Sequence, residues 1–270
     1  MHIALTNWGG LLPEVYFNME LLLVCIAAFA AGFIDAIVGG GGLVQTPVML
    51  ITFPHTPVAS LLGTVKIPSF CGTAVSAWQY SKRVALRWKL VLWIAAAAFC
   101  AAMLGSYMVT VLSNNVLKPV ILVVLIAVAL VTYGRKNLGQ AQQEISYKPA
   151  LARGISAGLL IGFYDGFIGP GTGSFLVLVF ISLIGYDFLH ASAHAKLVNL
   201  ATNFASILYF GATGNIIWQL ALPMAVCNML GGWTGTRLAL MRGNRFIRLF
   251  FLTIVAATIL RFAWDIFSSQ

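Results

Sequence analysis

Apolar stretches long enough to cross a lipid bilayer recur along almost the whole chain, and they constrain the fold more than any other feature. A membrane-spanning helix needs about 20 consecutive apolar residues. Apolar side chains make up 60% of the 270 residues and charged ones only 9%, which is too little charge for the surface of a soluble domain. The sequence therefore predicts an all-α, polytopic integral membrane protein. The predicted full spans are residues 59–80, 90–112, 119–133, 190–210, 219–240 and 246–267.

Two further apolar regions, 21–53 and 155–184, are interrupted by the glycine-rich segments GGGG at 39–42 and GPGTG at 169–173. Glycine and proline break helices, so each region is predicted to form a hairpin of a longer and a shorter helix. A second helix beginning after Gly42 or after Gly173 would direct free backbone N–H groups at an anion. Close packing of helices through small residues is the alternative explanation. The candidate substrate-binding residues of the two breaks are Gly40, Gly41, Gly42, Gly171, Thr172 and Gly173.

The two halves of the chain align without a gap at a shift of 130 residues. At this shift GFID at 32–35 falls on GFYD at 162–165, and Lys66 falls on Lys196. Asp and Lys are rare inside membrane segments, so their coincidence with the glycine breaks indicates an internal repeat. We assign an N-terminal segment to 1–19, a first repeat to 20–135, a linker to 136–152 and a second repeat to 153–267. Each repeat is predicted to contain one glycine-broken hairpin and three transmembrane helices.

Most of the 16 Lys and Arg residues, which dominate a net charge of +9, flank the apolar segments. This placement follows the positive-inside rule, so we expect cytoplasmic basic loops, a cytoplasmic linker and no nucleic-acid partner. The basic loop 82–89 aligns with 212–219, which contains no Lys or Arg. We infer that the two repeats are inserted in opposite orientations, with both termini on the periplasmic or extracellular side. Inverted repeats are typical of secondary transporters, which bind substrate near the bilayer midplane.

Lys66 and Lys196 lie within apolar segments, where a charge costs about 3 kcal/mol and therefore faces a cavity and a partner. One interpretation is that one or both lysines bind a substrate anion. The other is a structural ion pair with Asp35 or Asp165, or an amino group that snorkels to the interface. The two carboxylates, which precede their glycine breaks by about one helical turn, either bind a coupling proton or brace the broken backbone. His194 is a candidate for a proton-linked role, because histidine titrates near neutral pH.

Neutral polar residues in the same segments can hydrogen-bond an oxyanion. The candidates for substrate binding are Asn199 and Asn203, and weaker cases are Gln45, Thr46, Ser174 and Thr202. The cysteines are scattered singly, with no spacing that indicates a metal site, and no nucleotide-binding motif is present. We therefore expect no cofactor, and the expected partners are a small-molecule anion and the lipid bilayer. The sequence leaves open whether the chain forms a homodimer.

The glycine-broken segments resemble those of the TauE/SafE-type sulfite exporter family. The resemblance rests on AGFIDAIVGGGG at 31–42 with Pro47, on GFYDGFIGPGTG at 162–173, and on GTVK at 63–66 and HAKLVN at 194–199. It extends over about residues 20–265. It implies a transporter of sulfite, small organosulfonates or related sulfur anions in the bacterial inner membrane.

The sequence and the resemblance together predict a secondary carrier for a sulfur-containing oxyanion, more an exporter than an importer, that works by alternating access of the two repeats. A carrier of another anion such as a carboxylate is the alternative, because lysines and helix N-termini bind both groups. A membrane-embedded enzyme would need a nucleophile with a base, or a metal cluster, and the sequence offers neither. A non-transporting scaffold would not explain the paired intramembrane Asp and Lys residues.

Overall fold

The computed structural model describes residues 14–113, 117 and 145–268, and these residues form helices and no strand. The predicted all-α class is thereby confirmed. The predicted span 119–133 and the linker residues 136–144 lie outside the described residues. The helices are α1 (Glu14–Val38), α2 (Gly42–Thr52), α3 (Val58–Ser81), α4 (Trp88–Val111), α6 (Tyr147–Phe167), α7 (Thr172–Val179), the π-helical turn η1 (Phe180–Ile184), α8 (Phe188–Ala212) and α9 (Trp218–Ser268).

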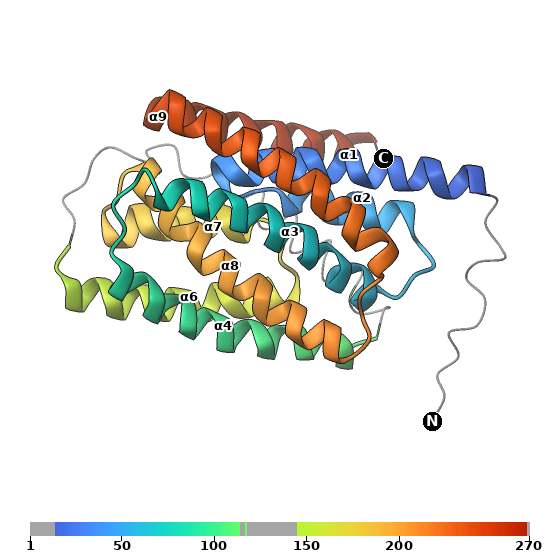
Figure 1. Ribbon diagram of the computed structural model, residues 1–270, viewed down its shortest axis with the longest axis horizontal. Coiled ribbons are helices and arrows are strands. Elements are labelled where there is room, and N and C mark those ends of the chain that lie inside the picture. The colour runs from blue at the N-terminus through green and yellow to red at the C-terminus, as the bar shows by residue number, and fades with distance from the viewer. Residues whose placement is uncertain (1–13, 114–116, 118–144, 269–270) are drawn as a thin grey trace.

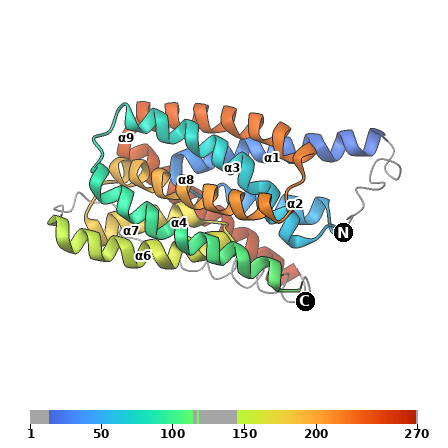
Figure 2. The same cartoon turned by 60° about the horizontal axis from the view of Figure 1, so that its bottom comes forward.

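The long helices coincide with the predicted spans. α3, α4 and α8 cover the predicted spans 59–80, 90–112 and 190–210 to within two residues at each end. α9 contains a non-helical residue, Gly243 (φ 68°), where the chain reverses direction between the predicted spans 219–240 and 246–267 (Figures 1 and 2). Within the described part of the chain, α3, α4 and residues 19–38 of α1 are long and apolar enough to span a membrane.

Two helix boundaries lie earlier than the sequence suggested. α1 begins at Glu14, inside the predicted N-terminal segment 1–19, and α6 begins at Tyr147, inside the predicted linker 136–152. Both extra stretches lengthen the longer helix of a broken hairpin at its N-terminal end. The hairpins themselves are present, as a long and a short helix in each half of the chain.

The two halves interlock. In Figure 1, α1 and α9 lie along the top, α4 and α6 lie along the bottom, and α3 and α8 lie between them. α1 packs on α9 and α6 packs on α4, so the long helix of each hairpin lies against a helix from the other half. α3 and α8 contact each other at the centre, while α3 also contacts α9 and α8 also contacts α4. The place where α1 and α6 break is therefore enclosed by helices from both halves.

Glycines outside the breaks bring the helices of each outer pair into close contact. A Cβ added at Gly162 or Gly166 of α6 would overlap the backbone of α4 at Ala98 and Ala102. A Cβ at Gly235 of α9 would overlap the backbone of α1. Small residues permit such close approach. Inside a lipid bilayer the hydrophobic effect does not drive helices together, so the resulting van der Waals contact stabilises the helix pairs. Close packing thus explains these glycines, while the glycines at the breaks require a separate account.

The distribution of polarity is that of a protein surrounded by lipid. Large apolar side chains are exposed on the outer faces of the helices, for example Leu22, Leu160 and Leu222. Two lysines are buried inside instead, because Lys66 and Lys196 are no more than 5% exposed. A chain that exposes leucines and buries lysines is stable in a bilayer rather than in water. The protein is therefore a multi-pass membrane protein.

Candidate functional site

The two hairpins break at the positions predicted from their glycines. α1 ends at Val38 and α2 begins at Gly42, while α6 ends at Phe167 and α7 begins at Thr172. Gly39 (φ 81°), Gly169 (φ 91°) and Gly171 (φ 85°) adopt the left-handed conformation that side chains with a Cβ rarely tolerate. The short helices start at Gly42 and Thr172, slightly earlier than the starts after Gly42 and after Gly173 that we expected.

The two breaks cross each other in direct backbone contact. The Ser174 N–H donates a hydrogen bond to the Gly39 carbonyl at 2.8 Å, and the Ser174 hydroxyl donates to the Val38 carbonyl at 3.0 Å. A Cβ at Gly39 or at Gly173 would overlap the backbone of the other glycine. Glycine is therefore required at both positions, and the contact ties the first half of the chain to the second at the point where both helices are interrupted.

Each intramembrane lysine is paired with the aspartate of the other half. The Lys66 Nζ lies 3.1 Å from the Asp165 Oδ1 and donates a 2.6 Å hydrogen bond to the Asp165 carbonyl. The Lys196 Nζ lies 2.8 Å from the Asp35 Oδ2 and also donates to the Asp35 carbonyl. The partners are 99 and 161 residues apart in the sequence, so only the folded chain brings them together. The sequence-based alternative of a lysine–aspartate ion pair is thus realised twice.

The position of these pairs has a physical reason. Asp165 lies in the last turn of α6 and Asp35 lies in the last turn of α1. The C-terminal end of a helix carries a partial negative charge, so the helix end and the carboxylate both stabilise the ammonium group. Leaving either charge unpaired at this depth would cost several kcal/mol. The pairs therefore hold the broken helix ends in place and keep three buried charges, and the partly buried Asp35 carboxylate, compatible with an apolar surrounding.

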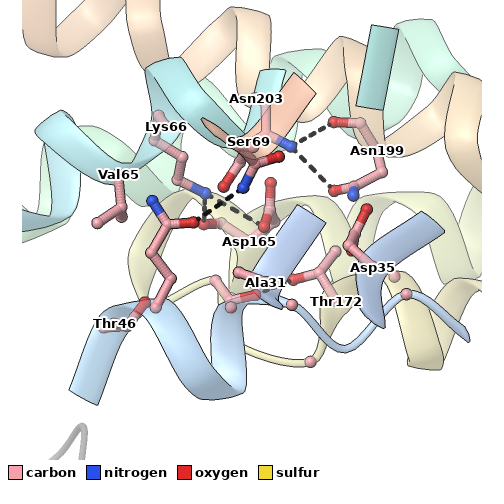
Figure 3. A pocket seen from close by; sticks show the side chains of 18 of the residues that line it. Ala31, Asp35, Thr46, Val65, Lys66, Ser69, Asp165, Thr172, Asn199 and Asn203 are labelled. Atoms are coloured by element: carbon pink, nitrogen blue, oxygen red, sulfur yellow. Dashed lines mark hydrogen bonds and ion pairs between the residues drawn. The ribbon is translucent and has the colours of Figure 1, made fainter. Parts of the chain in front are cut away.

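A cavity of about 40 Å³ lies at the crossing of the breaks (Figure 3). By the same measure a water molecule needs about 10–15 Å³, so the space suits a few waters or a small ion. Ten of the predicted site residues line the cavity: Asp35, Gly41, Gly42, Lys66, Asp165, Gly171, Thr172, Gly173, Asn199 and Asn203. The N-terminal ends of α2 and α7 border it at Gly42 and Thr172, so both helices direct the positive ends of their dipoles toward it.

Three predicted site residues do not line the cavity: Gly40, Lys196 and His194. Lys196 is 1% exposed and lies behind Asp35, to which its amino group is bonded. His194 lies among the rings of Tyr186 and Phe180. Its Nε2 accepts a hydrogen bond from the Arg87 backbone N–H at 3.0 Å, so its Nδ1 carries the proton and donates to the His190 carbonyl at 2.7 Å. Both ring nitrogens of His194 are occupied, and the bond to Nε2 connects α8 to the loop before α4.

Four more polar residues line the cavity: Gln45, Thr46, Ser69 and Asn228. Gln45 and Thr46 were weaker candidates in the sequence, whereas Ser69 and Asn228 were missed. Ser69 lies 130 residues before Asn199, so the alignment of the two halves offered a signal for it. Asn228 aligns with Ala98 at the same shift, and nothing in the sequence distinguished it.

The neutral side chains of the cavity form two amide pairs. The Asn203 Nδ2 donates to both the Asn199 carbonyl (2.8 Å) and the Asn199 Oδ1 (3.1 Å). The Asn228 Nδ2 donates to the Gln45 Oε1 at 3.2 Å. Figure 3 shows Lys66 and Asp165 facing the Asn199–Asn203 pair across the space. A lysine, amide groups and two helix N-termini around one small space can bind an oxyanion by charge and by hydrogen bonds.

An apolar helical bundle that encloses a charged cavity between interrupted helices has the architecture of a membrane transporter. Among the described ranges, no group of three His, Cys, Asp or Glu side chains is placed to hold a metal ion. The sulfite exporter TauE/SafE family matches residues 24–262, and the chain belongs to this family.

Curated relatives are named as transporters as well. The chain is 36% identical to the probable membrane transporter protein ORF9 of Sinorhizobium sp, over 91% of this chain and 93% of that one. It is 34% identical to a probable membrane transporter protein of Haemophilus influenzae, over 87% and 91% of the two chains. It is also 34% identical to the probable membrane transporter protein YfcA of Escherichia coli K12, over 88% and 87%. No solved structure matches the chain.

Proposed function

We propose that this membrane transporter is a secondary carrier that exports sulfite, an organosulfonate or a related small sulfur-containing anion across the bacterial inner membrane. The observation that carries the proposal is the cavity at the crossing of the two breaks, where Lys66 and the N-termini of α2 and α7 meet. The family description favours a sulfur oxyanion over a carboxylate.

The proposed mechanism is alternating access of two inverted repeats, and the helix contacts support it. The contact of α1 with α9 corresponds to that of α6 with α4, and the contact of α3 with α9 corresponds to that of α8 with α4. The two lysine–aspartate pairs are reciprocal in the same way. A substrate site on the pseudo-symmetry axis of two such repeats opens to either side when one repeat rocks against the other.

The proposed orientation places the basic loops in the cytoplasm and both termini outside. Cysteines introduced at Ala85→Cys, in the loop before α4, and Thr213→Cys, after α8, occupy equivalent loop regions of the two repeats. In a variant without native cysteines, an impermeant thiol reagent added to intact cells should label the second position and not the first. Labelling of both positions from the same side would contradict the inversion.

Transport is tested with purified full-length protein in liposomes loaded with sulfite. Radiolabelled sulfite added outside at neutral pH, where the singly protonated form is present, should enter by counterflow, above the rate of protein-free liposomes. Excess isethionate should inhibit this exchange, whereas acetate should not. Lys66→Met should abolish the exchange and Lys89→Met, a matched change outside the cavity, should not. Absence of counterflow in the unaltered protein would contradict the proposed function, and inhibition by acetate alone would redirect it to carboxylates.

A further inference from the structure

Two polar atoms at the cavity are buried without a hydrogen-bond partner among the described residues: Nε2 of Gln45 and Oδ2 of Asp165. Gln45 is 1% exposed and Asp165 is 3% exposed, and both line the cavity. The first atom is a donor and the second is an acceptor. Because unpaired buried polar atoms are costly, a ligand that satisfies both is favoured. Such a ligand needs an acceptor oxygen and also a donor hydrogen.

The charges at the cavity cancel before any ligand enters. Lys66 is paired with Asp165, and Lys196 is paired with Asp35. An anion with acceptor atoms only would place its charge beside an Asp165 oxygen that no donor reaches, and the two negative groups would repel each other. A donor hydrogen on the ligand turns this repulsion into a hydrogen bond.

Three donors around Asp165 are already engaged by other acceptors. The Thr172 hydroxyl donates to a carbonyl of its own break at 2.7 Å, and the Asn203 amide donates twice to Asn199. The Tyr164 hydroxyl, from the same helix as Asp165, donates to a carbonyl in the same break at 2.5 Å. The Oδ2 of Asp165 is thus left for the ligand.

We propose that Asp165 determines the specificity of this site by selecting oxyanions that carry their own hydrogen-bond donor. The inference rests on the proposed function and states which protein atoms bind the acceptor oxygens of the ligand and which binds its donor hydrogen. Lys66 and the Nε2 of Gln45 bind the oxygens of the ligand, and the Oδ2 of Asp165 accepts a hydrogen bond from it. The substrate class then comprises hydroxy- and amino-substituted sulfonates and the singly protonated form of a sulfur oxyanion.

Asp35 provides the matched control within the molecule. Its Oδ2 accepts one hydrogen bond from the Lys196 ammonium at 2.8 Å and another from the Thr73 hydroxyl at 3.3 Å. It borders the same cavity, but it lacks the buried, unpartnered oxygen that distinguishes Asp165. Asp35→Asn and Asp165→Asn therefore make the same chemical change at two carboxylates of one cavity, only one of which is assigned to the ligand.

The test compares isethionate with ethanesulfonate, which have the same charge and differ by one hydroxyl group. Binding of both to the purified full-length protein is measured by calorimetry. The unaltered protein should bind isethionate about tenfold tighter or more, as expected for one hydrogen bond to a charged group. Asp165→Asn should lose or reverse this preference, because an amide N–H would stand where the Oδ2 accepts. Asp35→Asn should keep the preference, and so should Asp165→Glu, which retains an acceptor.

Equal affinities for the two sulfonates in the unaltered protein would overturn the inference. Loss of the preference in Asp35→Asn as well would overturn its assignment to Asp165. Either result would leave the proposed function in place if radiolabelled sulfite still exchanges by counterflow. Absence of that exchange would contradict the proposed function itself, and the inference with it.

Discussion

The two lysine–aspartate pairs share the same geometry but differ in their surroundings. In each, a lysine amino group bonds a main-chain carbonyl and a carboxylate at the end of a broken helix from the other half. The Lys196–Asp35 pair is supplemented by the Thr73 hydroxyl, and its lysine lies outside the cavity. The Lys66–Asp165 pair borders the cavity with both members.

Residues that align between the two halves of the chain account for this difference. At the shift of 130 residues, Thr73 corresponds to Asn203 and Ser69 corresponds to Asn199. The Thr73 hydroxyl donates to Asp35, whereas the corresponding Asn203 amide donates to Asn199 instead of to Asp165. The Lys196–Asp35 pair therefore has an additional donor, while the Lys66–Asp165 pair keeps one carboxylate oxygen without a partner. We infer that the Lys196–Asp35 pair is structural and the Lys66–Asp165 pair binds ligand.

The largest effect is expected from breaking the structural pair on one side only. Lys196→Met leaves Asp35 charged without its cation, so it should destabilise the protein by about 3–5 kcal/mol. Adding Asp35→Asn should recover much of this loss, because no unpaired charge remains. Thermal unfolding in detergent of the two single variants and the double variant measures the coupling. Additive effects of the two substitutions would show that the pair does not act as a unit.

The next largest effect is expected on ligand affinity, which should differ between variants in which one or the other pair is neutralised. The neutralised variant Lys66→Met with Asp165→Asn should bind sulfite about a hundredfold more weakly, as expected when a charged hydrogen-bond donor of about 2–3 kcal/mol is removed. The neutralised variant Lys196→Met with Asp35→Asn should bind within a few-fold of the unaltered protein. Equilibrium binding of radiolabelled sulfite checks both. Equal losses in the two double variants would erase the distinction between the pairs.

A smaller effect is expected at the neutral side of the cavity. Gln45→Leu removes the unpartnered Nε2 and should weaken sulfite binding about tenfold, the usual scale for one lost hydrogen bond at a buried site. Gln79→Leu, a matched change on α3 outside the cavity, should leave the affinity unchanged. The same binding assay applies. An unchanged affinity in Gln45→Leu would place the ligand away from α2.

The smallest effect concerns the hydroxyl that completes the structural pair. Thr73→Val keeps the shape of the side chain and removes its 3.3 Å hydrogen bond to the Asp35 Oδ2. The variant should lose about 1 kcal/mol of stability, a typical contribution of one hydrogen bond. Sulfite affinity should not change. A loss of affinity with stability intact would indicate that Asp35 takes part in ligand binding.

The glycine breaks and most of the spans could be predicted because their signals are local. Gly39 and Gly171 mark helix ends through their own backbone freedom, and a span is recognised by the length of its apolar run. The break at Gly243 was likewise placed between two predicted spans. The starts of α1 and α6 were predicted too late, because the extra turns contain residues that resemble a loop, such as Asn18, Lys148 and Pro149.

The pairing at the site could not be predicted, because it depends on the fold. Lys66 meets Asp165 across 99 residues, and no pattern in the sequence favoured this partner over Asp35. Asn228 reaches the cavity only because α9 packs on α1 and α3, and it has no polar counterpart in the first repeat. His194 was a candidate on the general chemistry of histidine, whereas the fold places it beside Tyr186 with both nitrogens bonded.

The most direct test of the central claim is to locate a bound anion by anomalous diffraction. Crystals of the full-length protein grown with selenite, the selenium analogue of sulfite, reveal the ion through the anomalous signal of selenium. The account predicts a peak in the cavity at the crossing of the breaks, within hydrogen-bond distance of the Lys66 Nζ and the Gln45 Nε2. A peak confined to the basic loop 82–89, or beside Lys196 with none in the cavity, would contradict it.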